Sequence, residues 1–400
     1  MRTKAYRIPA LVLVLFLLGF LVLPNVFNSR ERKAFSDDVR LDEARARYHV
    51  DRVGDSVEVV PGEFYRRGWI IQGLLGSAYR DLWQQKIKVP VIKLSETGLS
   101  PVEFSGGMQT IGIRARDTAG GLWSVRSVNK DQSAALPAFL RPTILRPMFR
   151  DQACSLNPYG SLAVAKLAPA IEIHHGNPQL YFVPYDPSLG KYNSRMAGRL
   201  VTLMKYVDEG EGVKKDSLSV LETEDMLHLL NKKEASIDTS LYLRSRLFDM
   251  LISDWDRHEG NWKWLLRKQD NKAVIEPLPV DRDMAFYRFG DGVVNWIALA
   301  FVNTFQSFTP DYNNVSGLVE QAEHLDNRIL RHMQKEEFAK QAAFIQQRLN
   351  DELISNAFKA YPASAYRLVG QEHEQTLKER LKRLPEVAEQ YYELIQEFRD

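Results

Sequence analysis

The sequence predicts an α+β protein with two unequal lobes behind one membrane-spanning helix. Three observations carry this prediction: an uncharged apolar run near the N-terminus, strand-like segments between residues 88 and 207, and helical patterns from residue 222 onward. The chain has 400 residues, 44% apolar and 26% charged, as is usual for globular proteins. Its 53 Lys and Arg nearly balance its 51 Asp and Glu, so we expect no nucleic-acid partner. The single cysteine excludes an internal disulfide.

The N-terminal apolar run predicts a membrane anchor. No charged residue occurs from Ile8 to Ser29, and Ala10 to Leu23 is almost entirely Leu, Val and Phe. A helix of about 20 such residues spans a bilayer core. The run lacks a small-residue cleavage site, which favours an uncleaved signal anchor over the alternative, a cleaved signal peptide. We therefore expect a single-pass membrane protein, anchored by residues 1–30, with its globular part on the extracytoplasmic (periplasmic) side.

Residues 31–68 are expected to be a charged linker, and residues 69–210 a β-rich small lobe. Two alternating segments flank the turn Asp117–Gly121, a pattern typical of a β-hairpin. The expected elements of this lobe are a helix over 69–83, strands over 88–94, 108–116 and 122–128, helices within 143–170 with a break near Asn157, and strands over 180–183 and 199–207.

Residues 211–400 are expected to form a helical large lobe. Asp238 is predicted to cap a helix whose apolar residues keep helical spacing from Leu241 to Ile252. A second hairpin is predicted from residues 262–266 and 273–278. The amphipathic segments 317–358 and 372–398 predict further helices.

Two acid-rich segments flank this second hairpin. Ser253–Trp262 precedes it and Pro279–Phe286 follows it. Carboxylates packed so closely repel one another unless a cation lies among them, and a divalent metal ion is the simplest such cation. Phosphoryl transfer requires an Asp that orients a hydroxyl, a metal-binding Asn five positions later and a second metal-binding Asp. Asp256, Asn261 and Asp281 occur in this order.

These segments resemble known kinases. The loop Asp256–Asn261 resembles the D-R-H-x-x-N loop of phosphatidylinositol kinases, the D-x-H-x-x-N loop of HipA-type kinases and a loop of the secretory-pathway kinases. Pro279–Phe286 resembles the P-W-D-x-D-x-x-F segment of CotH-type spore-coat kinases. Residues 79–286, roughly half the chain, resemble a bacterial family of uncharacterised kinase-like proteins. The resemblance implies a bilobal protein-kinase-like fold.

The resemblance also implies roles for individual residues. Asp256 matches the catalytic Asp, Asn261 and Asp281 match metal ligands, and Asp283 is a second candidate ligand. The residues implied in nucleotide binding belong to the small lobe: Gly106, Gly107, Gln109 and Thr110 in a phosphate-covering loop, Arg126 and Lys130 as alternative phosphate-binding cations, and Asp151 as the acidic partner on the following helix.

Several other conspicuous residues are given structural roles. We expect the pair His174-His175 in a solvated loop and Arg257 in an ion pair with a neighbouring acid. His258 is expected to hold its loop by hydrogen bonds.

The sequence therefore predicts a membrane-anchored kinase. It would bind ATP with Mg²⁺ or Mn²⁺ between the lobes, with adenine near residues 200–206, and transfer the γ-phosphoryl group to a hydroxyl. The acceptor, whether protein, lipid or saccharide, is not specified by the sequence. An alternative is a catalytically weak pseudokinase that acts as a membrane-tethered interaction module. A metal-dependent hydrolase is a third possibility, but it leaves the small lobe unexplained.

Overall fold

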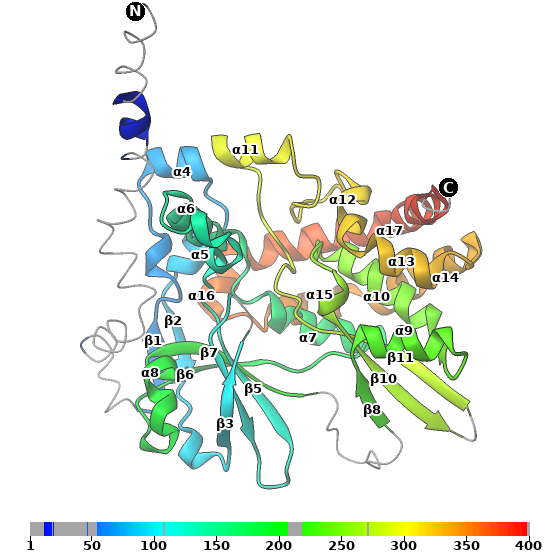
Figure 1. Ribbon diagram of the computed structural model, residues 1–400, viewed down its shortest axis with the longest axis horizontal. Helices are drawn as coiled ribbons and strands as arrows, with labels where there is room; N and C mark the ends of the chain where they lie inside the picture. The colour runs from blue at the N-terminus through cyan, green and yellow to red at the C-terminus, as the bar shows by residue number, and fades with distance from the viewer. Residues whose placement is uncertain are drawn as a thin grey trace, which may run out of the picture.

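The computed structural model describes residues 12–17, 19, 46, 54–106, 109–206, 218–269 and 272–397. It has the predicted α+β composition, with two larger sheets on one side of the molecule and most helices on the other (Figure 1). In the part of the chain that is described, no helix is both long enough and apolar enough to cross a bilayer. The expected anchor over residues 1–30 lies outside the described residues except for 12–17 and 19, so it stays a prediction.

A five-stranded antiparallel sheet forms the centre of the small lobe. The predicted hairpin is present, and Asp117 closes its turn by accepting hydrogen bonds from the backbone of Ala119 and Gly121 at 3.0 and 2.7 Å. One face of the sheet buries Ile113, Val125 and Val201. The strands in spatial order are β3 (Ser100–Ser105), β4 (Gly112–Arg116), β5 (Leu122–Ser127), β7 (Arg199–Lys205) and β6 (Gln179–Val183). Strand β3 was not predicted.

The folded domain begins before residue 69. Strand β1 (Ser56–Val59) pairs with β2 (Ile87–Pro90), and the short helix η1 (Glu63–Tyr65) buries two aromatic side chains. The prediction of a linker is therefore wrong for this stretch, because strands of four residues give little periodic signal.

The helix predicted over 69–83 is broken into two. Helix α4 (Trp69–Leu75) ends at Gly76, and α5 (Arg80–Gln84) follows it. Gly76 has a φ of +89°, and a Cβ there would lie 2.5 Å from the backbone oxygen of Asp291. Only glycine fits this close approach in a left-handed conformation.

Two helices connect β5 to β6, with the break that the sequence predicts. Helix α6 (Leu145–Gln152) is separated from α7 (Gly160–Ala170) by a turn at Asn157. The side-chain oxygen of Asn157 accepts a hydrogen bond from the backbone N–H of Tyr159 at 3.0 Å. This turn brings the start of α7 close to the five-stranded sheet.

The large lobe is built around α10 (Thr239–Leu251). Asp238 caps this helix as predicted, since its Oδ1 accepts from the Leu241 N–H at 2.8 Å. The second predicted hairpin is β10 (Trp262–Gln269) and β11 (Lys272–Pro279). Its Trp262 and Trp264 pack against Tyr242 of α10. β8 (Leu218–Leu221) and β9 (Ser236–Ile237) extend its sheet, and α9 (Thr223–Asn231) lies against β10.

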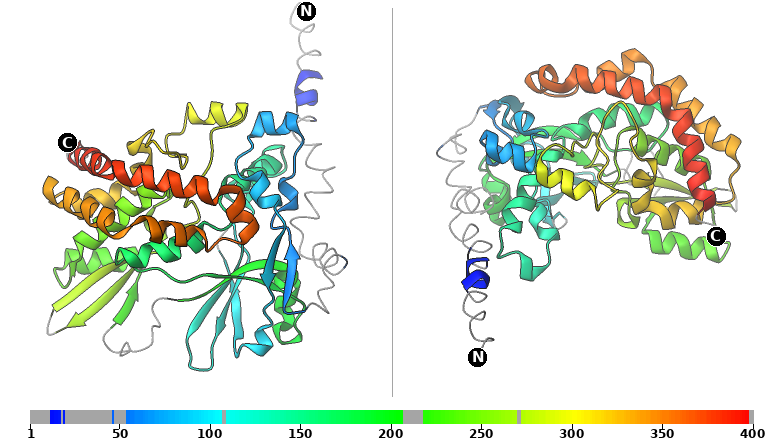
Figure 2. Two further views of the ribbon diagram at one scale, coloured as in Figure 1. Left: turned by 180° about the vertical axis from the view of Figure 1, so that it is seen from behind. Right: turned by 90° about the horizontal axis from the view of Figure 1, so that it is seen from above.

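The C-terminal helices support the end of α10. Figure 2 shows the long helix α17 (Gln371–Glu397) running along the back of the molecule. Its Arg380 donates to the backbone oxygens of Met250 and Leu251 at 2.6 and 2.8 Å, which satisfies carbonyls at the end of α10. The other helices are α8 (Asn193–Met196), α11 (Val293–Leu299), α12 (Val315–Val319), α13 (Glu323–Leu330), α14 (Lys335–Arg348), α15 (Asp351–Phe358) and α16 (Ala363–Ala365).

Candidate functional site

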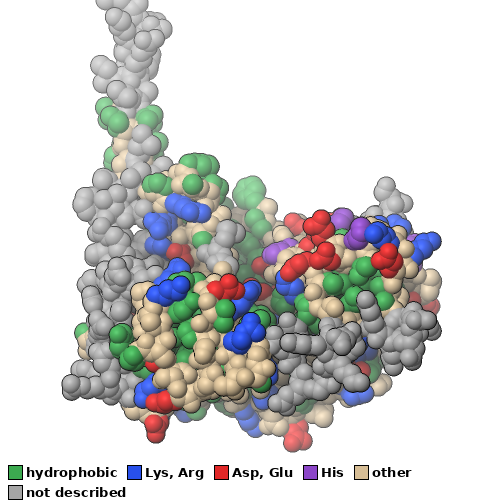
Figure 3. Space-filling view, turned by 60° about the horizontal axis from the view of Figure 1, so that its bottom comes forward, with side chains coloured by type: hydrophobic (Ala, Val, Ile, Leu, Met, Phe, Trp, Pro, Cys, Tyr) green, Lys and Arg blue, Asp and Glu red, His purple; other side chains and the backbone are tan. Residues whose placement is uncertain are grey.

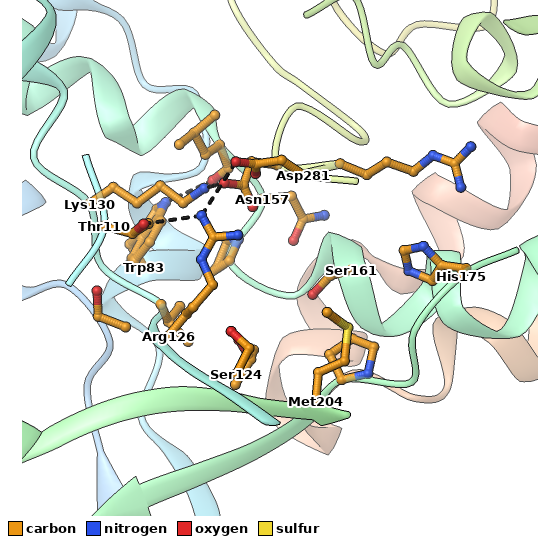
Figure 4. Close-up of a pocket in the computed structure, with 18 residues that line it drawn as sticks. Trp83, Thr110, Ser124, Arg126, Lys130, Asn157, Ser161, His175, Met204 and Asp281 are labelled. Carbon is orange, nitrogen blue, oxygen red and sulfur yellow. Dashed lines mark hydrogen bonds and ion pairs between the residues drawn. The ribbon is translucent and has the colours of Figure 1, made fainter. Parts of the chain in front are cut away.

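A pocket lies between the five-stranded sheet, the start of α7 and the segment that follows β11 (Figure 4). It encloses about 850 Å³ when the open space at its mouth is included. On the side of the molecule where the sheets lie, basic and acidic side chains sit next to one another (Figure 3). Five of the predicted site residues line the pocket: Thr110, Arg126, Lys130, Asp281 and Asp283.

Two basic side chains of the small lobe reach into this pocket. The guanidinium of Arg126, on β5, donates to Thr110 Oγ1 at 3.1 Å and to Asp281 Oδ2 at 3.3 Å. Lys130 follows the strand and forms an ion pair with Asp283. Burial lowers the pKa of the Lys130 ammonium to about 8, although the charge of Asp281 opposes this effect. Each cation therefore has its own carboxylate, and both pairs face the same space.

The two carboxylates come from the segment that leaves β11. Asp281 has a φ of +56°, a conformation that Asp tolerates better than most residues and that is common at functional sites. Burial would raise the pKa of Asp281, but the charges of Lys130 and Arg126 outweigh it and hold this pKa below its usual value. Asp281 is therefore ionised at neutral pH and able to bind a cation.

Asp256 and Asn261 lie on the loop between α10 and β10, close to this pocket. The side-chain amide nitrogen of Asn261 donates to the Asp256 backbone oxygen at 2.6 Å, so its Oδ1 is not used in this bond and could serve as a metal ligand. Burial raises the pKa of Asp256, the charge of Asp281 adds to this, and His258 opposes it from 3.9 Å. A raised pKa makes the carboxylate a better proton acceptor for a hydroxyl.

His258 holds this loop as predicted. Its Nδ1 accepts a hydrogen bond from the Gly260 N–H at 3.0 Å.

A buried cluster of charges fastens the loop to the segment after β11. Arg257 is fully buried and donates to the backbone oxygens of Asn261 and Val280 at 2.6 and 3.0 Å. Its Nε lies 3.3 Å from Asp249 Oδ2, and Arg282 donates to Asp249 Oδ1 at 3.0 Å. The expectation that Arg257 pairs with a neighbouring acid is confirmed. Arg257 thus sets the position of Asp256 and Asn261 relative to Asp281.

The glycine-containing loop reaches the pocket only in part. Gly106 has a φ of +119°, and a Cβ there would lie 2.2 Å from the Thr110 backbone oxygen, so the turn requires glycine. Gly107 lies outside the described residues. The Gln109 backbone oxygen accepts from the Asp131 N–H at 2.8 Å, and Gln109 does not line the pocket. Thr110 is the described member of this loop that does.

Asp151 does not meet the two cations of the pocket. Its buried carboxylate pairs with Arg80 and lies 2.9 Å from Arg67 Nε. A buried carboxylate needs such counterions, and these arginines come from the segment before the sheet. The predicted pairing of Asp151 with Arg126 or Lys130 is therefore wrong, and Asp281 and Asp283 take that place.

Asn157, Ser161 and His175 are among the polar residues of the pocket that were not candidates. Asn157 holds its turn and donates to the Tyr361 hydroxyl at 2.9 Å. His175 was expected in a solvated loop, but burial lowers its pKa to about 3 and keeps it neutral. They come from a turn, from the first turn of α7 and from the segment after α7, so the fold of the chain brings them together.

The residues fit a magnesium site only together with phosphate. Among the residues that the structure describes, no three His, Cys, Asp or Glu side chains gather around one point. Mg²⁺ is usually held by one or two carboxylates plus substrate phosphates and water. Asp281, Asp283 and the Asn261 amide oxygen are the predicted ligands that could hold such an ion, with phosphate oxygens completing its coordination.

Comparisons with known proteins do not assign this chain to a family. No protein-family model and no curated protein matches the chain. A solved structure that it resembles is a Helicobacter pylori proinflammatory kinase, CtkA, with a TM-score of 0.39 and 13% identity over 74% of this chain and 95% of that chain. A similarity of this size establishes neither fold nor activity, so the functional argument rests on the site.

Proposed function

We propose that this protein is a kinase-like phosphotransferase that uses ATP and Mg²⁺ or Mn²⁺. One observation carries the proposal: Arg126 and Lys130 of the small lobe face Asp281 and Asp283 across one pocket. Cations that bind phosphate and carboxylates that bind metal are the two halves of a metal–nucleotide site. The loop that carries Asp256 lies beside them.

The small lobe would bind the nucleotide. Arg126 can contact two phosphate oxygens through its planar guanidinium, and Lys130 adds a compact positive charge. Thr202 and Met204 of β7 line the same pocket, on the strand where the sequence places adenine. On binding, each cation exchanges a carboxylate for a phosphate, so neither is left buried without a counter-charge.

The large lobe would perform the transfer. Asp256 orients the acceptor hydroxyl and takes its proton, aided by its raised pKa. Asp281, Asp283 and Asn261 would hold the metal ion, which neutralises the charge that develops on the transferred phosphoryl group. Arg257 holds Asp256 and Asn261 in position relative to Asp281 through its hydrogen bonds to the backbone.

A pseudokinase remains the second candidate. The observation that favours it is the pairing of Asp151 with Arg80 and Arg67, because Lys130 then has no acidic partner from the helix after β5. In this case the site would bind nucleotide without transferring phosphate, and the lobe would act as an interaction module.

Attachment to a membrane is part of the proposal. It is supported by the uncharged run from Ile8 to Ser29, which is long enough to cross a bilayer. The domain would then lie on the extracytoplasmic side, and its acceptor would be a protein, lipid or saccharide hydroxyl.

Nucleotide affinity is expected to fall as the pH rises through the pKa of Lys130, which is about 8. Below this pH the ammonium is charged and binds phosphate, and above it the charge is lost. Because apparent affinity scales with the competent fraction, the Kd for Mg–ATP should rise about tenfold between about pH 7 and about pH 9. Titration of the full chain with a fluorescent ATP analogue measures this change.

The matched control is Lys130→Arg. Its guanidinium stays charged throughout this range, so the Kd should change little with pH. A wild-type Kd that is equally independent of pH would remove Lys130 from the site. Absence of nucleotide binding at every pH would overturn the proposed function.

A further inference from the structure

Two neighbouring helices expose an apolar surface, which we call the α4–α11 face. No residue of α4 is buried, and in α11 only Asn295 is. Trp69, Trp296 and Phe301 are 82, 71 and 83% exposed. The other exposed members are Ile70, Ile71, Leu74, Val293 and Ile297. Isolated apolar side chains on a surface are ordinary, but a continuous group of this kind marks a binding surface.

The face is held in place by polar contacts behind it. The side-chain amide of Asn295 donates to the Leu75 backbone oxygen at 3.0 Å, and Asp291 accepts from the Ser77 N–H at 2.6 Å. A Cβ at Gly292 would lie 2.3 Å from the Gly76 nitrogen, so the two helix ends touch. Figures 1 and 2 show the helices side by side at one end of the molecule. The apolar side chains therefore project from a fixed platform.

The composition of this face matches a lipid surface. No Asp, Glu, Lys or Arg occurs from Gly68 to Tyr79 or from Val293 to Phe308. Protein interfaces of soluble partners usually have a charged or polar rim. Exposed tryptophans beside aliphatic side chains are typical of segments that lie at the boundary between lipid headgroups and acyl chains.

The sequence before the domain also favours a bilayer as the occupant. Residues 31–53 join the predicted anchor, residues 1–30, to Gly54, where the described domain begins. Such a segment reaches at most about 80 Å when fully extended. The described helical residues 12–17 lie on the same side of the molecule as α4 (Figure 1). A tether of this length raises the local concentration of membrane, so even a weak contact would be populated.

We propose that the α4–α11 face lies in the surface of a lipid bilayer and is a second membrane contact, separate from the N-terminal anchor. The contact fixes the orientation of the domain on the membrane. It does not depend on the proposed kinase activity, because none of its residues lines the pocket.

Site-specific fluorescence tests this proposal on the full chain in phosphatidylcholine–phosphatidylglycerol vesicles. Burial raises the pKa of Cys154 to about 12, so this thiol does not compete for the label. An environment-sensitive fluorophore is placed on Ile70→Cys or Ile297→Cys. The control is Val220→Cys, an exposed position on β8 of the other sheet. Unchanged melting temperatures of the labelled variants show that the fold is kept.

We expect doxyl-labelled lipid to quench the fluorophore at positions 70 and 297 at least about threefold more than at position 220, and iodide to quench it less. Equal iodide quenching at all three positions would overturn the proposal. Protection from iodide without quenching by lipid would also overturn the proposal. In that case the α4–α11 face would be covered by a second copy of the chain or by its own N-terminal segment. The proposal would also be overturned if the full chain failed to bind the vesicles.

Discussion

Asp256→Asn is expected to lower phosphoryl transfer from ATP by about 1,000-fold while leaving nucleotide affinity nearly unchanged. The amide keeps the shape of the side chain but cannot accept the proton of a hydroxyl. Asp256 does not line the pocket, so the proposed contacts of the nucleotide with Arg126 and Lys130 would remain. Autophosphorylation and hydrolysis of γ-labelled ATP measure transfer, and a fluorescent ATP analogue measures binding.

The matched control for this loss is Glu259→Gln on the same loop. Glu259 is half-exposed and faces His324 at 2.8 Å rather than the pocket, so its removal should change the rate less than about twofold. An Asp256→Asn variant with the wild-type rate would contradict the role of Asp256. A wild-type protein that binds nucleotide but transfers no phosphate would favour the pseudokinase.

Arg257→Met is expected to lower the free energy of unfolding by about 3–5 kcal/mol, because it removes one partner from a buried cluster of charges and leaves Asp254 without its ion pair. Arg257 lies between Asp249 and Asp254, both of which are fully buried. Burial already raises the pKa of Asp254, so its ionised form depends on this arginine. Chemical denaturation of the full chain, followed by tryptophan fluorescence, measures the change.

An exposed arginine provides the comparison for this variant. Arg383 pairs with Asp311, and both side chains are about half-exposed or more. Such a surface pair contributes at most about 1 kcal/mol, so Arg383→Met should be close to wild type. If Arg257→Met had the same free energy of unfolding as the wild type, the buried cluster would not be what holds the loop.

Local patterns in the sequence predicted much of the fold. The helix cap at Asp238 and the hairpin of β10 and β11 depend on contacts between near neighbours in the chain, and both are confirmed. The helix over 69–83 is broken because Gly76 approaches Asp291, a residue more than 200 positions away. Strand β1 was missed because four residues carry too little periodicity.

The site was predicted less completely than the fold. The sequence identified Arg126 and Lys130 as alternatives, whereas the structure gives each cation a carboxylate of its own. Asp151 was assigned by its place in the chain, but Arg80 and Arg67 lie closer to it. The choice between counterions depends on distances across the fold, which a linear pattern does not contain.

Thermal unfolding of the full chain with and without Mg–ATP tests the central claim most directly. A ligand at about 100 times its Kd stabilises the folded state by about 2.7 kcal/mol, which should raise the melting temperature by several degrees. Asp281→Ala should lose this increase, whereas Asp311→Ala, an exposed position that does not line the pocket, should keep it. No increase in the wild type at millimolar nucleotide, or an equal increase in Asp281→Ala, would contradict a metal–nucleotide site between the lobes.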